Sequence, residues 1–306
     1  MQQQYKHHLS DYEQWDQLSH AEDWILYPEN MGTKLCIDEV ALSKGELYTI
    51  VSNPTARTQK GSLVAMVKGT KSAQVCKVLR RIPLKTRQLV EQVCTDLASS
   101  MQLIAKSSFT KAALVSDRFH VQQLVTNALQ DLRIEYRWKA IKAQNEQHKE
   151  AKANDQTYQP LVLANGDTAK QLLARSRYLL FKTPNKWTDS QKQRAAILFE
   201  QYPELKKAYH LSINFRSIYE QSKTQGEALE KLEQWYSKVE SSPFDCFDIA
   251  AQSIKNHQTE ILNYFISRTT NGLAENLNGK IKAFRAIFRG VSDIPFFLYR
   301  VSMIFS

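Results

Sequence analysis

The sequence predicts an α/β or α+β protein, in which a mixed five-stranded sheet carries a large all-helical insertion before the closing helix. Strand patterns, short turns and helical periods alternate between residues 34 and 117. Residues 139–265 are charged, rich in Gln, Lys and Glu, and almost free of strand pattern. Gly and Pro, with 9 and 8 of 306 residues, are too scarce for an all-β protein built from many tight turns.

Five segments have the composition and the period of strands, although the fourth can also be read as a helix end followed by a strand. They are residues 34–43, 46–52, 61–69, 87–96 and 111–117. Short turns join the first three, so we expect these to be antiparallel. Helical patterns fill residues 70–83 and 97–109, and another helix starts after residue 117.

The change in composition along the chain predicts four parts. They are an N-terminal lead-in (1–34), the first part of the core (35–138), the helical insertion (139–265) and the closing helix of the core (266–306). No fixed-period repeat joins the helices of the insertion, so a solenoid is not indicated.

The net charge of +10 favours a polyanionic partner, of which nucleic acid is the commonest, although such charge can also serve solubility alone. Four cysteines stand far apart, at positions 36, 76, 94 and 246, with no CxxC pair. A zinc finger is therefore not indicated, and we expect buried small apolar residues in a reducing compartment. The polar start at residues 1–23 and the short apolar run near the end predict a soluble, cytoplasmic protein without a membrane partner.

Three acidic residues stand where carboxylates are chemically informative. Asp38 lies in an apolar strand, Asp96 lies where the fourth strand ends, and Glu275 lies among basic residues on the closing helix. Hard divalent cations such as Mg²⁺ bind a few carboxylates together with substrate phosphates. Two such ions can clamp both oxygens of a phosphodiester displacement. The pattern therefore indicates metal-dependent chemistry on nucleic acid.

Each acid also has a simpler interpretation. Asp38 can be a solvated strand end, because it adjoins Glu39, and Asp96 can be a helix N-cap. Glu275 can be an exposed acid in the first turn of its helix. It has no cation three or four residues later, where Asn278 and Gly279 stand, so an ordinary helical ion pair does not explain it.

The closing helix has an apolar stripe on the side opposite Glu275. We expect this helix to be buried on both sides, with the stripe against the helical insertion. The stripe consists of Leu273, Leu277, Ile281, Phe284 and Phe288.

A second polar cluster lies in the segment SDRFH at the end of the fifth strand. Asp117 and His120 are three residues apart, so their side chains can share one face of a helix start. They can support the reaction near a phosphate, or they can be an N-cap and a partly buried histidine. The sequence has no HExxH, no GxxxxGK[ST] and no GxSxG motif, so a zinc protease, a P-loop ATPase and an α/β-hydrolase are not indicated.

Four segments resemble bacterial insertion-sequence transposases of the DDE superfamily, in the third branch of the ISL group. The segments are LCIDEVALSKGELYTIV, VCTDLASSM, SDRFHVQQL and RTTNGLAENLNGKIKAFRAIFRGVSDIPFFLYRV, and the similarity extends roughly from residue 23 to the C-terminus. DRFH and NGLAENLNGKIK are the specific motifs among them.

The resemblance implies a ribonuclease-H-like catalytic fold with a helical insertion before the last acid. It implies that Asp38, Asp96 and Glu275 are the catalytic triad and hold two Mg²⁺ or Mn²⁺ ions, with Asp117 and His120 in support. The expected activity is DNA cleavage at transposon ends followed by strand transfer. A structure-selective nuclease and an inactive DNA-binding remnant are the alternatives.

The resemblance also implies DNA partners, both transposon ends and target. We expect phosphate contacts from basic residues of the closing helix: Lys280, Lys282, Arg285 and Arg289. Full-length relatives carry an N-terminal DNA-binding region, for which the residues before Asp38 leave no room. We therefore expect a separate DNA-binding subunit, a homodimer in the active complex, and a place at the nucleoid of a bacterial cytoplasm.

Overall fold

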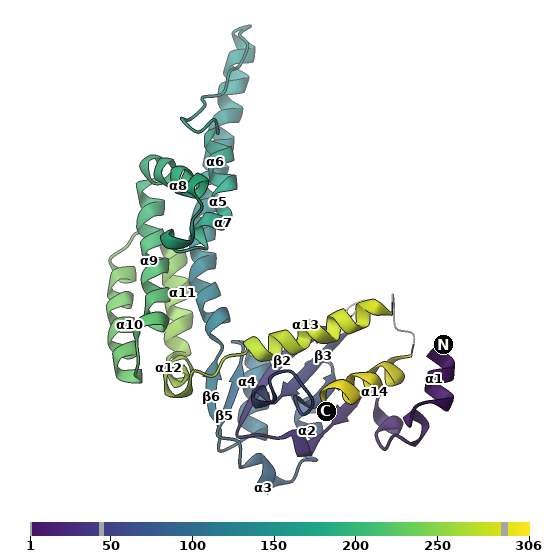
Figure 1. Cartoon of the computed structure of the whole chain (residues 1–306). Helices are drawn as coiled ribbons and strands as arrows, with labels where there is room; N and C mark the ends of the chain where they lie inside the picture. The colour runs from purple at the N-terminus through teal and green to yellow at the C-terminus, as the bar shows by residue number, and fades with distance from the viewer. Residues whose placement is uncertain (1, 43–45, 289–292) are drawn as a thin grey trace. The chain divides into compact units, whose positions relative to one another are not determined.

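The computed structural model describes residues 2–42, 46–288 and 293–306, and Figure 1 labels its elements. The chain forms two compact units. The first comprises Met1–His120 together with Thr259–Ser306, and the second is Val121–Gln258. The expected limits at residues 35, 139 and 266 differ from these unit limits, and as domain boundaries they stay predictions.

The first unit is built on one mixed sheet, which has six strands among the described residues and not the five that we expected. The strands are β1 (Trp24–Leu26), β2 (Lys34–Ala41), β3 (Leu47–Ser52), β4 (Leu63–Lys68), β5 (Gln92–Thr95) and β6 (Ala113–Ser116). Their order across the sheet is β1-β4-β3-β2-β5-β6. The additional strand, β1, lies in the segment expected to be a lead-in, and it pairs antiparallel with β4.

Strand direction divides the sheet into two halves. β2, β3 and β4 pair antiparallel, as their short connections predicted. β5 and β6 run parallel to β2. Parallel neighbours need a crossover connection. The helices α2 (Ser72–Leu79) and α3 (Leu84–Arg87) precede β5 in the chain, and α4 (Ser99–Ser108) connects β5 to β6. The carboxyl ends of β2, β5 and β6 therefore meet at one edge.

Residues along a strand alternate between the two faces of a sheet. Apolar residues stand on both faces here, and helices cover each of them. One face packs on α2 (Ser72–Leu79) and α4 (Ser99–Ser108), with the short α3 (Leu84–Arg87) nearby in the chain. The opposite face packs on α13 (Gly272–Ile287) and α14 (Ile294–Phe305). Figure 1 shows these two helices together on that side.

The apolar stripe of α13 packs on the sheet and on α14, whereas we expected it to pack on the helical insertion. Leu277 and Ile281 are fully buried in one cluster with Ile50 of β3 and Phe297 of α14. Leu273, at the start of the stripe, is 36% exposed. The next helix in the chain, α14, supplies a second apolar surface for the stripe through Phe297.

Two further helices belong to the first unit. α1 (Gln2–His8) lies at the N-terminus, and α12 (Gln258–Ser267) leads back into the unit from the helical one. Asn263 of α12 donates a hydrogen bond of 2.8 Å to the backbone oxygen of Leu114 in β6. This contact fixes α12 beside the edge strand, immediately before the chain enters α13.

The regular elements of the second unit are all helices, and all of its residues, 121–258, are described. Its main elements are α5 (Arg118–Ala153, which begins in the first unit), α6 (Ala169–Arg175), α7 (Arg177–Leu180), α8 (Asp189–Gln201), α9 (Pro203–Gln221), α10 (Gln225–Glu240) and α11 (Asp245–Asn256). α5 is one helix of 36 residues. The segment from residue 139, a helix or a linker by sequence, continues it.

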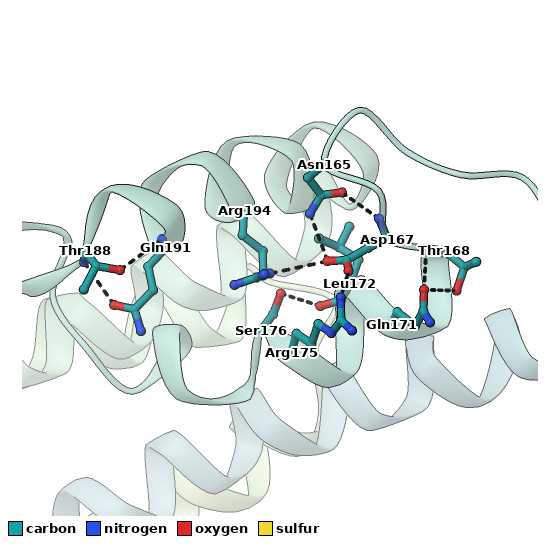
Figure 2. Close-up of polar contacts among 10 residues, drawn as sticks. All are labelled: Asn165, Asp167, Thr168, Gln171, Leu172, Arg175, Ser176, Thr188, Gln191 and Arg194. Carbon is teal, nitrogen blue, oxygen red and sulfur yellow. Dashed lines mark hydrogen bonds and ion pairs between the residues drawn. The ribbon is translucent and has the colours of Figure 1, made fainter.

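A buried aspartate joins α6 to α8 in this unit (Figure 2). Asp167 is 1% exposed and forms ion pairs with Arg175 and Arg194. Asn165 donates a further hydrogen bond of 2.9 Å to Oδ2 of the same carboxylate. Capping boxes at Thr168 and Thr188 begin α6 and α8. Charge and capping together fix these helix starts.

The cysteines lie as small apolar residues are expected to lie. Cys36, Cys76 and Cys94 are buried, Cys246 is half-buried, and all four are free thiols. Among the described residues, no helix has the length and apolar character needed to cross a membrane.

Candidate active site

Three aspartates lie in one row across the parallel half of the sheet. Cys36 of β2 pairs with Cys94 of β5, and Asp38 and Asp96 each follow two residues later. Strands keep the same face at every second residue, so both aspartates lie on the face of the two thiols. The backbone N–H of Asp117 donates a hydrogen bond of 2.8 Å to the backbone oxygen of Thr95. This bond continues the β5–β6 register and places the third acid beside Asp96.

Asp38 is half-buried, and neutral groups bind its carboxylate. Oδ1 accepts the backbone N–H of Glu39 at 2.9 Å, and Oδ2 accepts the amide of Asn278 at 2.8 Å. Burial, and then the charges of Asp96 and Glu275, raise the pKa of Asp38 to about 6, against the lowering effect of the backbone hydrogen bond. The charges of Asp96 and Glu275 therefore both reach the carboxylate of Asp38.

Asp96 follows β5 directly and is half-buried. Its Oδ1 accepts the backbone N–H of Ala98 at 2.9 Å in a local turn. The N-cap position of α4 belongs to Ala98, so Asp96 is not the cap of that helix. The turn leaves one carboxylate oxygen of Asp96 without a hydrogen bond from the described residues.

Asp117 and His120 form the contact that their spacing predicted. Nδ1 of His120 lies 3.1 Å from Oδ2 of Asp117, which is 2% exposed. The carboxylate also accepts the backbone N–H groups of Phe119 and Asn271, at 3.2 and 3.0 Å. These contacts hold the pKa of Asp117 below its usual value despite burial, and the hydrogen bond to Asp117 raises the pKa of His120.

The first two turns of α13 connect the two ends of the aspartate row. Asn271, just before the helix, contacts Asp117, and Asn278 contacts Asp38. Glu275 lies between these two residues, in the first turn, and is exposed. Within the described parts of the chain, no Lys or Arg forms an ion pair with Glu275. Its surroundings are the carboxylates and the imidazole of the site.

One group of side chains is close enough to hold a cation as it stands. The ligand atoms of Asp117, His120 and Glu275 all lie within 4.8 Å of one another. Asp38 and Asp96 do not belong to a group that meets this limit in the described residues. Carboxylate oxygens suit Mg²⁺ and Mn²⁺, and imidazole is also a transition-metal ligand. The donor set of Asp117, His120 and Glu275 therefore fits a divalent cation such as Mn²⁺. Glu275 belongs both to this set and to the expected triad.

The basic residues expected to contact DNA differ in their contacts with the rest of the protein. Lys280 donates to the backbone oxygen and the hydroxyl of Thr58, at 3.0 and 2.8 Å, and Arg285 donates to the backbone oxygen of Leu42. Lys282 is exposed. Arg289 lies outside the described residues. Of the described three, Lys280 and Arg285 already have protein partners, which the sequence did not reveal.

Two asparagines of this site were not singled out by the sequence. Asn271 is fully buried, and neither atom of its amide has a hydrogen-bond partner among the described residues. Asn278 is 6% exposed, and its Oδ1 is likewise without such a partner. Buried amides are normally bonded. The only signal in the sequence was their placement in NGLAENLNG, on either side of Glu275.

The model of the transposase family of the ISL3 group, a group of DDE transposases, matches residues 35–301. The match includes the whole aspartate row and α13. The chain therefore belongs to this transposase family. Searches among curated proteins and among solved structures found no match.

Proposed function

We propose that this transposase cleaves DNA at transposon ends and joins the freed end to target DNA, with Asp38, Asp96 and Glu275 as catalytic carboxylates. One observation carries the proposal. Helix α13 places Glu275 between its contacts with Asp117 and Asp38, beside a row of acids that no described Lys or Arg neutralises. Uncompensated carboxylates that share a face are unfavourable unless a cation is bound.

Two Mg²⁺ or Mn²⁺ ions are the cofactors that this donor set fits. When bound, such ions lower the pKa of water and neutralise charge on the attacking and leaving oxygens. Asp38, Asp96 and Glu275 would hold them. Burial and the charges of Asp96 and Glu275 raise the pKa of Asp38 to about 6, so its ionised form would be stabilised by a bound cation.

The remaining residues of the site position these groups. Asp117 fixes the start of α5 and the backbone before α13, so it aligns His120 with Glu275. His120, with its raised pKa, can carry a proton and a positive charge toward a phosphate oxygen. Asn278 holds one oxygen of Asp38 and so orients the other.

The fold that we propose for the sheet and its covering helices is ribonuclease-H-like. The support is a mixed sheet with carboxylates at the ends of parallel strands, and a last acid on a helix that packs across them. The proposed partners are transposon-end and target DNA, a separate DNA-binding subunit and a second copy of the chain. Such a complex acts at the bacterial nucleoid.

Cleavage of DNA by single-carboxylate variants tests the proposal. The substrate is a supercoiled plasmid that carries the DNA flanking the gene on both sides, with Mg²⁺ or Mn²⁺. We expect Asp38→Asn, Asp96→Asn and Glu275→Gln each to lower cleavage by about a thousandfold or more, because each removes a proposed metal ligand. Binding to the same DNA in EDTA should stay within about twofold of wild type, since phosphate contacts do not depend on the triad.

Glu39→Gln is the matched control, because Glu39 adjoins Asp38 in β2 and is exposed. It should cleave as the wild type does. Full cleavage by Asp38→Asn would sink the assignment of the triad. Cleavage without products joined to target DNA would identify a nuclease, and EDTA-insensitive binding without any product would identify a DNA-binding protein.

A further inference from the structure

A buried arginine of α5 in the helical unit has only neutral partners. Arg133 is 6% exposed. Its Nε donates a hydrogen bond of 2.7 Å to Oε1 of Gln130, and its Nη1 donates one of 2.9 Å to the backbone oxygen of Leu173. No described carboxylate forms an ion pair with it. A buried charge that is bonded but not neutralised is costly to keep.

Two further guanidinium groups adjoin this buried charge and increase its cost. Burial first, and then the charges of Arg177 and Arg137, lower the pKa of Arg133. Gln130 donates 3.5 Å to the backbone oxygen of Arg177, and this contact joins the start of α7 to α5. The three arginines therefore gather by the docking of one helix on another, across more than forty residues of sequence.

The two outer arginines are exposed and have no acidic partner. Neither Arg137 nor Arg177 forms an ion pair in the described structure, and both are exposed. Residues three and four positions from Arg137 on α5 include no acid. The nearby Arg175 differs, because it is paired with buried Asp167. The positive charge on this surface is thus left for an external anion.

An exposed aromatic ring follows each of these outer arginines in the chain. Trp138 is 63% exposed and Tyr178 is 67% exposed. The guanidinium of Arg177 lies 5.6 Å from the ring centre of Tyr178. Exposed rings beside guanidinium groups offer flat apolar surfaces on which the bases of a nucleic acid can stack.

These four residues, Arg137, Trp138, Arg177 and Tyr178, are here called the α5–α7 patch. Guanidinium groups bind phosphate with paired donors, and exposed rings stack on unpaired bases. We propose that the α5–α7 patch is a second DNA-binding surface of this chain, which holds the backbone and unpaired bases of a DNA end. The inference deepens the proposed function and rests on it for DNA as the polyanion.

Binding of two labelled DNAs to the full-length protein in EDTA tests this surface. One DNA is a blunt duplex, and the other is the same duplex with a single-stranded overhang. Arg137→Glu/Arg177→Glu should weaken binding to both by about tenfold or more, because two phosphate contacts become repulsive. The slope of log affinity against log salt should fall by about 2. Trp138→Ala/Tyr178→Ala should weaken binding to the overhang DNA by about tenfold and leave the blunt duplex nearly unchanged.

Control variants change the same charge, or an exposed apolar side chain, elsewhere in the unit. Lys206→Glu/Lys238→Glu alters two exposed residues of α9 and α10, and Ile249→Ala alters an exposed residue of α11. Each should bind within about twofold of wild type. Arg137→Gln/Arg177→Gln gives the same test without charge reversal, should the reversed variant not fold by circular dichroism.

Wild-type binding by both patch variants would overturn the inference, as would equal loss in the controls. A change in oligomeric state by light scattering, without a change in DNA binding, would instead identify a surface between protein chains. Plasmid cleavage by the same proteins separates the two claims. Loss of cleavage only in Asp38→Asn supports the triad whatever the patch does, and altered binding by patch variants supports the patch even if no cleavage occurs.

Discussion

Two buried aspartates, one in each unit, differ in the groups that bind their carboxylates. Asp167 of the helical unit is 1% exposed and is neutralised by Arg175 and Arg194 (Figure 2). Asp117 of the sheet unit is 2% exposed, and its partners are an imidazole and two backbone N–H groups. The first arrangement is complete as it stands. The second leaves the charge of the neighbouring acids available to a ligand.

The same contrast appears among the arginines of the helical unit. Arg175 neutralises a carboxylate, whereas Arg133 is held by neutral oxygens with two more arginines nearby. Uncompensated charge of one sign therefore collects at two places in this chain, negative at the end of the sheet and positive on α5 and α7. Each place has the sign that suits an ion or phosphate of the opposite charge.

The largest effect on stability is expected where the charges are fully compensated. Arg175→Gln/Arg194→Gln leaves the buried charge of Asp167 without a cation, which should cost about 3–5 kcal/mol locally. Amide hydrogen exchange should accelerate in peptides of α6 and α8. Lys192→Gln is the control, because its pair with Asp189 is exposed and should contribute less than about 1 kcal/mol. Equal exchange in both variants would show that the Asp167 cluster does not fix these helices.

A stabilising effect of opposite sign is expected at the uncompensated site. The folded-state pKa of Asp38, about 6, lies above its ordinary value of 3.8. A raised carboxyl pKa gives stability that is present below the unfolded value and lost as the pH rises through about 6. Asp38→Asn removes the charge and should stabilise the protein at pH 8 by about 1–3 kcal/mol, from about 1.4 kcal/mol for each pKa unit.

Thermal unfolding in EDTA at pH 4 and pH 8 measures this gain. The stabilisation should be near zero at pH 4 and full at pH 8, and Glu39→Gln should show neither. Adding Mn²⁺ should raise the melting temperature of the wild type more than that of Asp38→Asn. Asp38→Asn less stable than wild type at pH 8 would mean that its ionised form is well accommodated without a cation.

The smallest effect is expected for the imidazole. The pKa of His120 is raised in the fold, so its contribution is complete below the unfolded value of about 6.5 and is lost as the pH rises through the folded value. His120→Ala should therefore destabilise the protein more at pH 5.5 than at pH 9, by less than about 1 kcal/mol because the ring is partly exposed. Urea unfolding at the two pH values measures the difference, and a pH-independent loss would indicate packing alone.

The sequence predicted much of the sheet unit because its signals are local. Strand periods placed β2, β3, β4 and β6, and left the segment of β5 open between a strand and a helix end followed by a strand, which is the arrangement of α3 and β5. Spacing alone predicted the contact of Asp117 with His120. The three-residue strand β1 was missed, because so short a segment has no readable period. The stripe of α13 was recognised, but its partner was assigned wrongly, since periodicity identifies an apolar face and not the surface that covers it.

Other features depend on contacts between distant segments, and sequence patterns contain little information about them. The row of Asp38, Asp96 and Asp117 requires the strand register. The inward contacts of Lys280 and Arg285 require the position of α13 on the sheet. The α5–α7 patch likewise exists only because α7 docks on α5.

The most direct test of the central claim is the anomalous diffraction of a crystal grown with Mn²⁺. The proposed triad predicts manganese within about 2.0–2.6 Å of carboxylate oxygens of Asp38, Asp96 and Glu275. Manganese held by Asp117, His120 and Glu275, without either of the other two aspartates, would contradict the triad and assign the metal to the rival set. Manganese absent from all five residues would contradict a metal site here altogether.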